Sequence, residues 1–109
     1  MLPHLTRMLG DVAHGIPSYD PASDRFDRKR YWRGPTWAIM NTLIGFGLEE
    51  AGLAEQAAVL REKTAHLIST YGFAEYFDPI DGSPAGGGTF TWTAAVWLGW
   101  ASPNARKGL

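Results

Sequence analysis

The sequence lacks cysteine, strong net charge and any long apolar run. Without cysteine, disulfides, thiolate catalysis and cysteine-ligated zinc are excluded, and the composition fits a cytoplasmic protein. A formal net charge of -1 gives no electrostatic basis for binding nucleic acid. No apolar run approaches the roughly 20 residues that a membrane span requires, and polar residues interrupt the first ten positions, where a secretory signal would be apolar. We therefore expect no nucleic-acid partner and no membrane partner.

Signatures of metal and cofactor binding are also lacking. The three histidines show no ligand spacing to one another or to an acidic pair. A triple glycine at 86–88 precedes a helical pattern, but no Gly-Lys-Ser/Thr follows it and no strand precedes it, so a phosphate-binding loop is not indicated. Asp78 and Asp81 are typical of turn residues and do not have the spacing of an EF-hand. We expect neither a metal nor a cofactor.

Apolar and aromatic residues are abundant instead, and their spacing predicts helices. The chain is 45% hydrophobic and 13% aromatic, with five tryptophans among 109 residues. Apolar residues at helical intervals predict helices over about 1–13, 34–51, 53–71 and 91–101, and no strand is convincing. Proline at the first helical position favours a start at 34–35, and Gly72 is typical of an αL cap after the third helix.

The helices predicted from residues 34 and 91 are apolar on nearly all sides, whereas the one between them has a polar face. A helix that is apolar all round is expected to be enclosed. Alternating enclosed and half-exposed helices are typical of an all-α toroid, and 109 residues cannot close such a ring. We expect residues 1–103 to be part of an incomplete helical domain and 104–109 to be a frayed tail. A homo-oligomer that covers the same faces is the alternative.

Two short segments carry the residues that could act on a ligand. In Tyr31-Trp32-Arg33-Gly34-Pro35-Thr36-Trp37, the rings can stack on a sugar and Arg33 can bind a hydroxyl or carboxylate. The alternative is that both tryptophans only pack the loop onto the core. In the second segment, Glu75 lies between Phe73 and the pair Tyr76-Phe77, surroundings that suit a proton acceptor. The alternative there is an ordinary carboxylate in a surface turn.

Taken in order, these motifs resemble a known enzyme family. Tyr-Trp-Arg-Gly-Pro-Thr-Trp, a helical hairpin, Gly-Phe-x-Glu-Tyr-Phe-Asp-Pro-x-x-Gly and Gly-x-Phe-Thr-Trp-Thr-Ala-Ala resemble the end of glycoside hydrolase family 63. Within that family, the bacterial mannosylglycerate and glucosylglycerate hydrolases are the most similar, and trehalases and processing α-glucosidases are more distant. The resemblance runs from Pro17 to Trp100.

The resemblance implies an (α/α)6 barrel that hydrolyses α-glycosidic bonds with inversion of configuration. By motif position, Glu75 matches the general base that activates water. The residues that match the wall of the sugar pocket are Tyr31, Trp32, Arg33, Gly34, Trp37 and Trp92.

The general acid of the family is an aspartate far upstream, in a region that this chain does not contain. We therefore expect the chain alone to be inactive and poorly folded, with a small carbohydrate and the missing N-terminal part of the same domain as its partners. A non-catalytic sugar-binding module and a helical interaction module remain alternatives.

Overall fold

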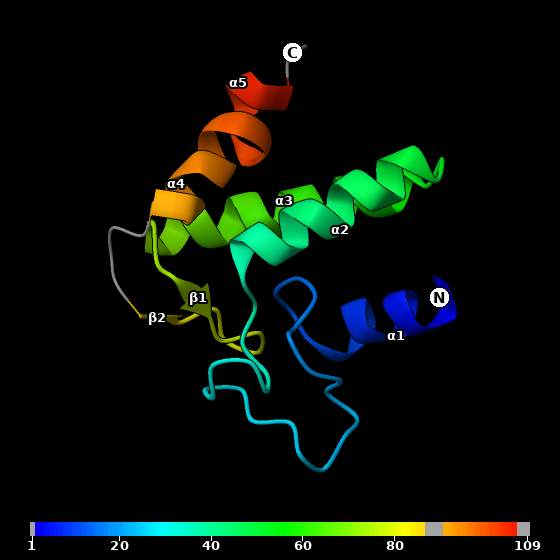
Figure 1. Ribbon diagram of the computed structural model, residues 1–109, viewed down its shortest axis with the longest axis vertical. Helices are drawn as coiled ribbons and strands as arrows, with labels where there is room; N and C mark the ends of the chain where they lie inside the picture. The colour runs from blue at the N-terminus through cyan, green and yellow to red at the C-terminus, as the bar shows by residue number, and fades with distance from the viewer. Residues whose placement is uncertain (1, 87–90, 107–109) are drawn as a thin grey trace.

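The computed structural model describes residues 2–86 and 91–106, which form a mostly helical chain (Figure 1). The helices and strands follow one another in this order: α1 (Leu2–Asp11), α2 (Ala38–Glu50), α3 (Ala54–Tyr71), β1 (Tyr76–Phe77), β2 (Pro84–Ala85), α4 (Thr91–Val96), a π-helix η1 (Trp97–Ala101) and α5 (Pro103–Arg106). None of the helices in this described part is long and apolar enough to cross a membrane.

Helices α2 and α3 form a hairpin that is the centre of the fold. They lie side by side in Figure 1, where α4 lies near one end of the pair, and Trp100 of η1 packs against Gly45 and Arg61 in the middle of the two helices. Leu60 and Leu67 of α3 are almost fully buried, as are Phe77 of β1 and Trp100 of η1. The Trp100 ring lies directly against Gly45, where a Cβ would overlap it, so the glycine lets η1 approach α2 closely.

The start of α2 corrects the prediction of a helix from residue 34 or 35. The helix begins at Ala38, and Trp37 is its extended N-cap residue. Thr36 cannot join the helix because its backbone pairs with Phe77, with N–O distances of 2.7 and 2.8 Å. A contact distant in sequence thus delays the helix that local propensity favours. Pro35 therefore precedes the helix and does not open it.

The short strands also correct the prediction that the chain has none. Tyr76 pairs with Ala85 and Phe77 with Pro84 in an antiparallel ladder. The intervening turn closes through a bond from Asp78 N–H to Ser83 O, at 2.8 Å. Strands of two residues are too short to show an alternating pattern, so periodicity could not indicate them.

The helix α2 is not enclosed within this chain. Its side toward α3 is buried, but Met40, Leu43 and Phe46 are 41%, 54% and 48% exposed. Asn41, one of its few polar residues, is 1% exposed and uses its amide to bind both the N–H and the C=O of Ile16, at 2.8 and 2.9 Å. The helix therefore anchors the preceding loop on one side and presents apolar side chains on another.

The ends of the later helices differ in detail from the predicted ones. Helix α3 ends before Gly72 as predicted, but Gly72 has φ +87° and ψ −163°, which is outside the αL region. The last long helix changes from α to π at Trp97, a feature that periodicity does not reveal. The first residues of the predicted frayed tail, 104–106, belong to the short helix α5, and fraying of the tail stays a prediction. Residues 107–109 lie outside the described part.

Candidate active site

Three of the aromatic residues predicted to form a wall, Tyr31, Trp32 and Trp37, lie together in the structure. The rings of Trp32 and Trp37 stack with centroids 3.9 Å apart and an interplanar angle of 6°. Tyr76 stacks on Trp37 at 5.0 Å, and the ring of Tyr31 is nearly perpendicular to those of Trp37 and Tyr76, with centroids 4.7 and 5.3 Å away. Tyr76 is the member that the sequence did not predict as part of the wall. Its place directly after Glu75 is the signal that could have indicated it.

The members of this stack differ in what they can offer a ligand. Trp37 is 3% exposed, and its indole N–H donates to the Tyr31 carbonyl at 2.9 Å. Trp32 and Tyr31 are 48% and 44% exposed. The outer rings can therefore stack on a sugar, whereas Trp37 mainly supports them from behind.

Glu75 lies beside this wall, at the entry to β1. Its side chain packs against Gly86, since a Cβ built on that glycine would fall 2.5 Å from the Glu75 Cβ and 2.9 Å from its Oε1. The pKa of the Tyr31 hydroxyl is raised, first by its partial burial and then by the negative charge of Glu75. The Tyr31 hydroxyl therefore lies near the half-buried Glu75 carboxylate. This brings together the two segments that the sequence singled out.

Two predicted wall residues have structural contacts of their own. Gly34 is buried against the backbone of Asp27, where a Cβ would overlap the carbonyl oxygen, and its N–H donates to Ser18 Oγ at 3.1 Å. The Arg33 guanidinium binds the carbonyl of Arg25, at 3.3 and 3.4 Å. Gly34 therefore permits close packing of the loop, and a contact from Arg33 to sugar stays a prediction.

Trp92 comes from α4, which is fastened next to Glu75. The hydroxyl of Thr93 donates to the Ala74 carbonyl at 2.6 Å, and Thr93 is fully buried. Trp92 itself is 61% exposed. Its role in the wall stays a prediction, and most of the glycine-rich segment before it, residues 87–90, lies outside the described part.

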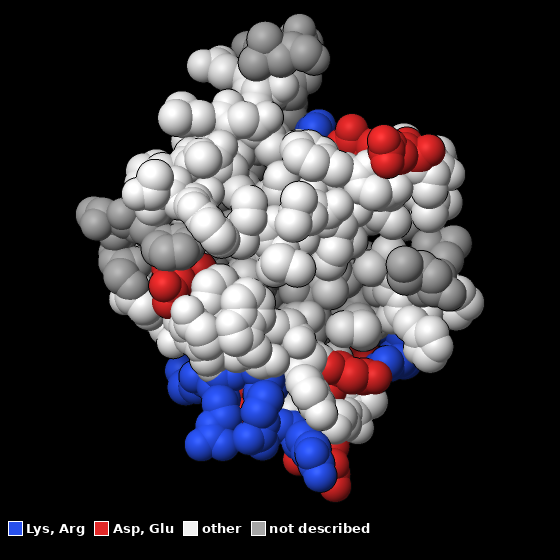
Figure 2. Space-filling view, in the orientation of Figure 1, with Lys and Arg blue, Asp and Glu red and all other residues white. Residues whose placement is uncertain are grey.

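Charged side chains are unevenly distributed on the surface. Figure 2 shows Lys and Arg gathered at the lower edge, over the loop between α1 and α2, and few charges across the centre of the face, over α2. Within 2–86 and 91–106, no three His, Asp or Glu residues lie close enough together to hold a metal ion. The described site is therefore a carboxylate beside aromatic rings.

Comparison with known proteins identifies the family to which the chain is related. The sequence profile of the mannosylglycerate hydrolase MGH1-like glycoside hydrolase domain matches residues 1–93. The chain belongs to this family. Mannosylglycerate hydrolase MGH1 of Selaginella moellendorffii is 46% identical over 96 residues, which are 88% of this chain and 20% of the relative. Glucosylglycerate hydrolase of Mycolicibacterium hassiacum is 40% identical over 91 residues, 83% of this chain and 20% of the relative.

Solved structures of this glycoside hydrolase family show the same arrangement of the chain. A GH63 mannosylglycerate hydrolase from Thermus thermophilus in complex with glucose superposes with a TM-score of 0.87 at 37% identity. The match covers 89% of this chain and 25% of that structure. The chain thus spans about a fifth of the length of the curated relatives that it matches.

Proposed function

We propose that this chain supplies the C-terminal part of an (α/α)6-barrel α-glycoside hydrolase that inverts configuration, with Glu75 as its general base. The observation that carries the proposal is the position of Glu75, half-buried beside Tyr31 and the stack of Trp32 on Trp37. A base next to a sugar-binding wall can activate a water molecule against a bound glycoside. Residues 1–103 then belong to one domain.

The substrate class follows from the relatives, which are named for mannosylglycerate and glucosylglycerate. We expect a small α-glycoside of this kind to bind here. Inversion requires an acid about 6.5–9.5 Å from the base, with water between them. The acid must come from residues outside this chain, since none of its aspartates occupies the motif that carries the acid in the family.

The test is a chimeric domain in which this chain replaces the segment that it matches in the Thermus thermophilus mannosylglycerate hydrolase, 42% identical over 85 residues. We expect the chimera to hydrolyse mannosylglycerate. Glu75→Gln should lower kcat by about 10² to 10⁴ because the water loses its base. Binding of substrate, measured by calorimetry, should be largely unchanged, since the amide keeps the size of the carboxylate.

Two further variants distinguish the loss of the general base from a general loss of charge and from damage to the aromatic wall. Glu50→Gln removes an exposed carboxylate at the end of α2 and should leave kcat unchanged. Trp32→Ala should abolish binding by removing the outer ring of the stack. Wild-type turnover in Glu75→Gln would show that Glu75 is not the base.

Two other functions each have one supporting observation. The exposed rings of Tyr31 and Trp32 also suit a sugar-binding module without catalysis. Such a module predicts calorimetric binding of sugar by the chain alone. The exposed apolar side of α2 suits a helical interaction module, which predicts a stable oligomer of the chain without ligand in size-exclusion chromatography.

A further inference from the structure

Tyr31 and Trp32 lie on a small closed loop, residues 27–33, which we call the aromatic lobe. Its two ends are joined by a bond from the Asp27 N–H to the Arg33 carbonyl, at 2.7 Å. Arg30 N–H donates back to the Asp27 carbonyl at 3.0 Å, and Gly34 packs on the Asp27 backbone. Because the lobe is closed on itself, its position depends on the contacts that fasten it to the rest of the chain.

One set of contacts fastens the side of the lobe nearest α2. The backbone of Thr36 pairs with that of Phe77, two residues after Glu75. The Trp37 indole holds the Tyr31 carbonyl. These contacts, together with the stacking of Trp32 on Trp37, hold the lobe against β1 and the start of α2.

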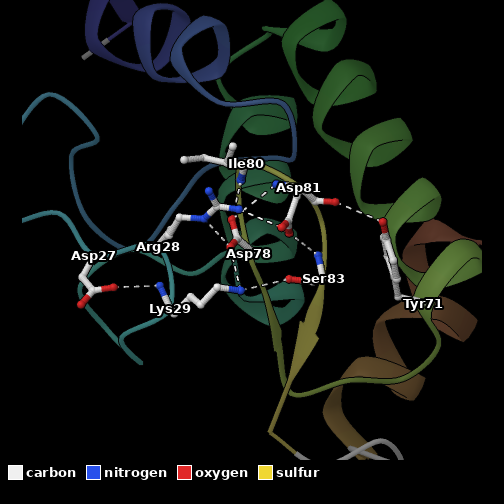
Figure 3. A network of polar contacts seen from close by, with 8 residues as sticks. All are labelled: Asp27, Arg28, Lys29, Tyr71, Asp78, Ile80, Asp81 and Ser83. Atoms are coloured by element: carbon white, nitrogen blue, oxygen red, sulfur yellow. Dashed lines mark hydrogen bonds and ion pairs between the residues drawn. The ribbon is translucent and has the colours of Figure 1, made fainter.

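A second set of contacts lies beside Asp27 at the closed base of the lobe, where Arg28 reaches the turn after β1 (Figure 3). Its Nε donates to Asp78 Oδ2 at 2.5 Å and its Nη2 to Asp81 Oδ2 at 2.8 Å. The Asp78 side chain is 3% exposed, and its other oxygen accepts the Ile80 N–H at 2.8 Å. Lys29 approaches Asp78 only at 3.4 Å.

This arrangement makes Arg28 a stronger partner of the buried Asp78 carboxylate than Lys29 is. Two charge-assisted bonds from one guanidinium define an orientation as well as a distance, which a single ammonium does not. The pKa of Arg28 is raised, mainly by its bond to Asp78, so the bond favours the charged form. Asp78 follows Glu75 by three residues, so the clamp joins the lobe to the segment that carries the base.

We propose that Arg28 is a positioning residue: by clamping Asp78 and Asp81, it sets the tilt of the aromatic lobe and thereby the place of Tyr31 and Trp32 relative to Glu75. The inference rests on the function proposed above. The wall meets the sugar in the ground state and the transition state alike, so a displaced wall weakens binding without slowing chemistry. Arg28 itself has no role in bond making or breaking.

The experiment compares Arg28→Gln, Arg28→Lys and Lys29→Gln in the chimeric domain. We expect Arg28→Gln to raise KM for mannosylglycerate roughly tenfold, within the hundredfold loss that a misplacement of about 1 Å can cause. The value of kcat should change less than about threefold, because the interaction lost is uniform binding. Arg28→Lys should raise KM less than Arg28→Gln does. Lys29→Gln, which removes the same charge one residue away, should behave as wild type.

A second measurement does not depend on catalysis. Two indoles stacked at 3.9 Å lie close enough for their electronic transitions to couple, and the difference in far-ultraviolet circular dichroism between the wild type and Trp32→Phe defines the band of this pair and its amplitude. Arg28→Gln should reduce this amplitude, and Lys29→Gln should not. A chimera without hydrolysis whose Arg28→Gln variant still loses the band would reject the proposed function and keep the clamp.

Three results would overturn the role of Arg28. The first is an unchanged band of the indole pair together with unchanged KM in Arg28→Gln. The second is an equal effect of Lys29→Gln, which would mean that only the local charge matters. The third is a fall of kcat and kcat/KM in proportion to a lowered melting temperature, which would make Arg28 merely structural.

Discussion

The loop between α1 and α2 and the turn after β1 together form what we call the loop side. Its polar groups bind other residues of this chain, whereas the exposed side of α2 leaves apolar side chains in water. On the loop side, the buried Asp78 is bound by Arg28 and by two backbone N–H groups. On the exposed side of α2, Leu43 and Phe46 are about half exposed, at 54% and 48%. Figure 2 shows no Lys, Arg, Asp or Glu side chains at the centre of this face.

The difference indicates which parts of the site this chain completes by itself. A closed network of hydrogen bonds needs nothing further to fix its geometry. Large apolar side chains at neighbouring positions on one helix face indicate a surface that another segment covers. In the barrel that we propose, the remaining part of the domain covers α2, while α3 keeps its outer face in water. The two helices of the hairpin should therefore respond differently to the same substitution.

The largest expected effect comes from Leu43→Asp in the chimeric domain. If the rest of the barrel covers α2, the substitution places an unpaired charge in a buried interface and should cost at least about 3 kcal/mol of the free energy of unfolding. Leu43 is 54% exposed within this chain, so a large loss would have to come from the covering part of the chimera. Urea unfolding of the chimera, followed by circular dichroism, measures this loss.

The matched control is Val59→Asp on α3, where Val59 is 45% exposed. It makes a similar change on the helix that we place outside and should cost less than about 1 kcal/mol in the same chimera. Equal losses for the two variants would contradict the assignment of α2 as the covered helix and α3 as the outer one.

A smaller effect is expected at the base of the aromatic lobe. In Gly34→Ala, the new Cβ overlaps the Asp27 carbonyl, which is backbone and cannot rotate away. The lobe must open, and we expect a loss of about 1–3 kcal/mol, as in other overpacked sites. Thermal unfolding of the chimera measures this loss.

The control for this prediction is Gly10→Ala in α1. A Cβ added at Gly10 would meet no heavy atom within 4 Å. Gly10→Ala should therefore raise the free energy of unfolding by up to about 1 kcal/mol, because alanine restricts the unfolded chain more than glycine does. A similar loss in both variants would show that the contact between Gly34 and Asp27 does not hold the lobe closed.

The sequence predicted the elements governed by local pattern and missed those governed by distant contacts. The extent of α3 and its end at Gly72 followed from periodicity and a glycine. The meeting of Trp32, Trp37 and Glu75 was predicted only through resemblance to a family. The delayed start of α2 and the clamp by Arg28 depend on residues 41 and 50 positions further along the chain, and no spacing rule joins such positions.

The smallest effect concerns the pH dependence of the loop side. Burial, and then the charge of His66, lower the pKa of His14, whose ring stacks on His66 at 5.9 Å. The unfolded state therefore binds the proton more tightly, and stability should fall as pH drops from about 7 through the ordinary value of 6.5 toward the lowered one. His14→Gln should remove this part of the slope.

The measurement is the melting temperature of the chimera at about pH 7.5 and about pH 5.5, where histidine changes charge. His66→Gln removes only the second cause, so it should reduce the slope less than His14→Gln does. Because burial is the larger cause, the order of these two variants tests whether the loop side is already closed by its own residues. The same slope in wild type and His14→Gln would mean that His14 is as solvated in the folded domain as in the unfolded chain, and the contrast with α2 would then lose one of its supports.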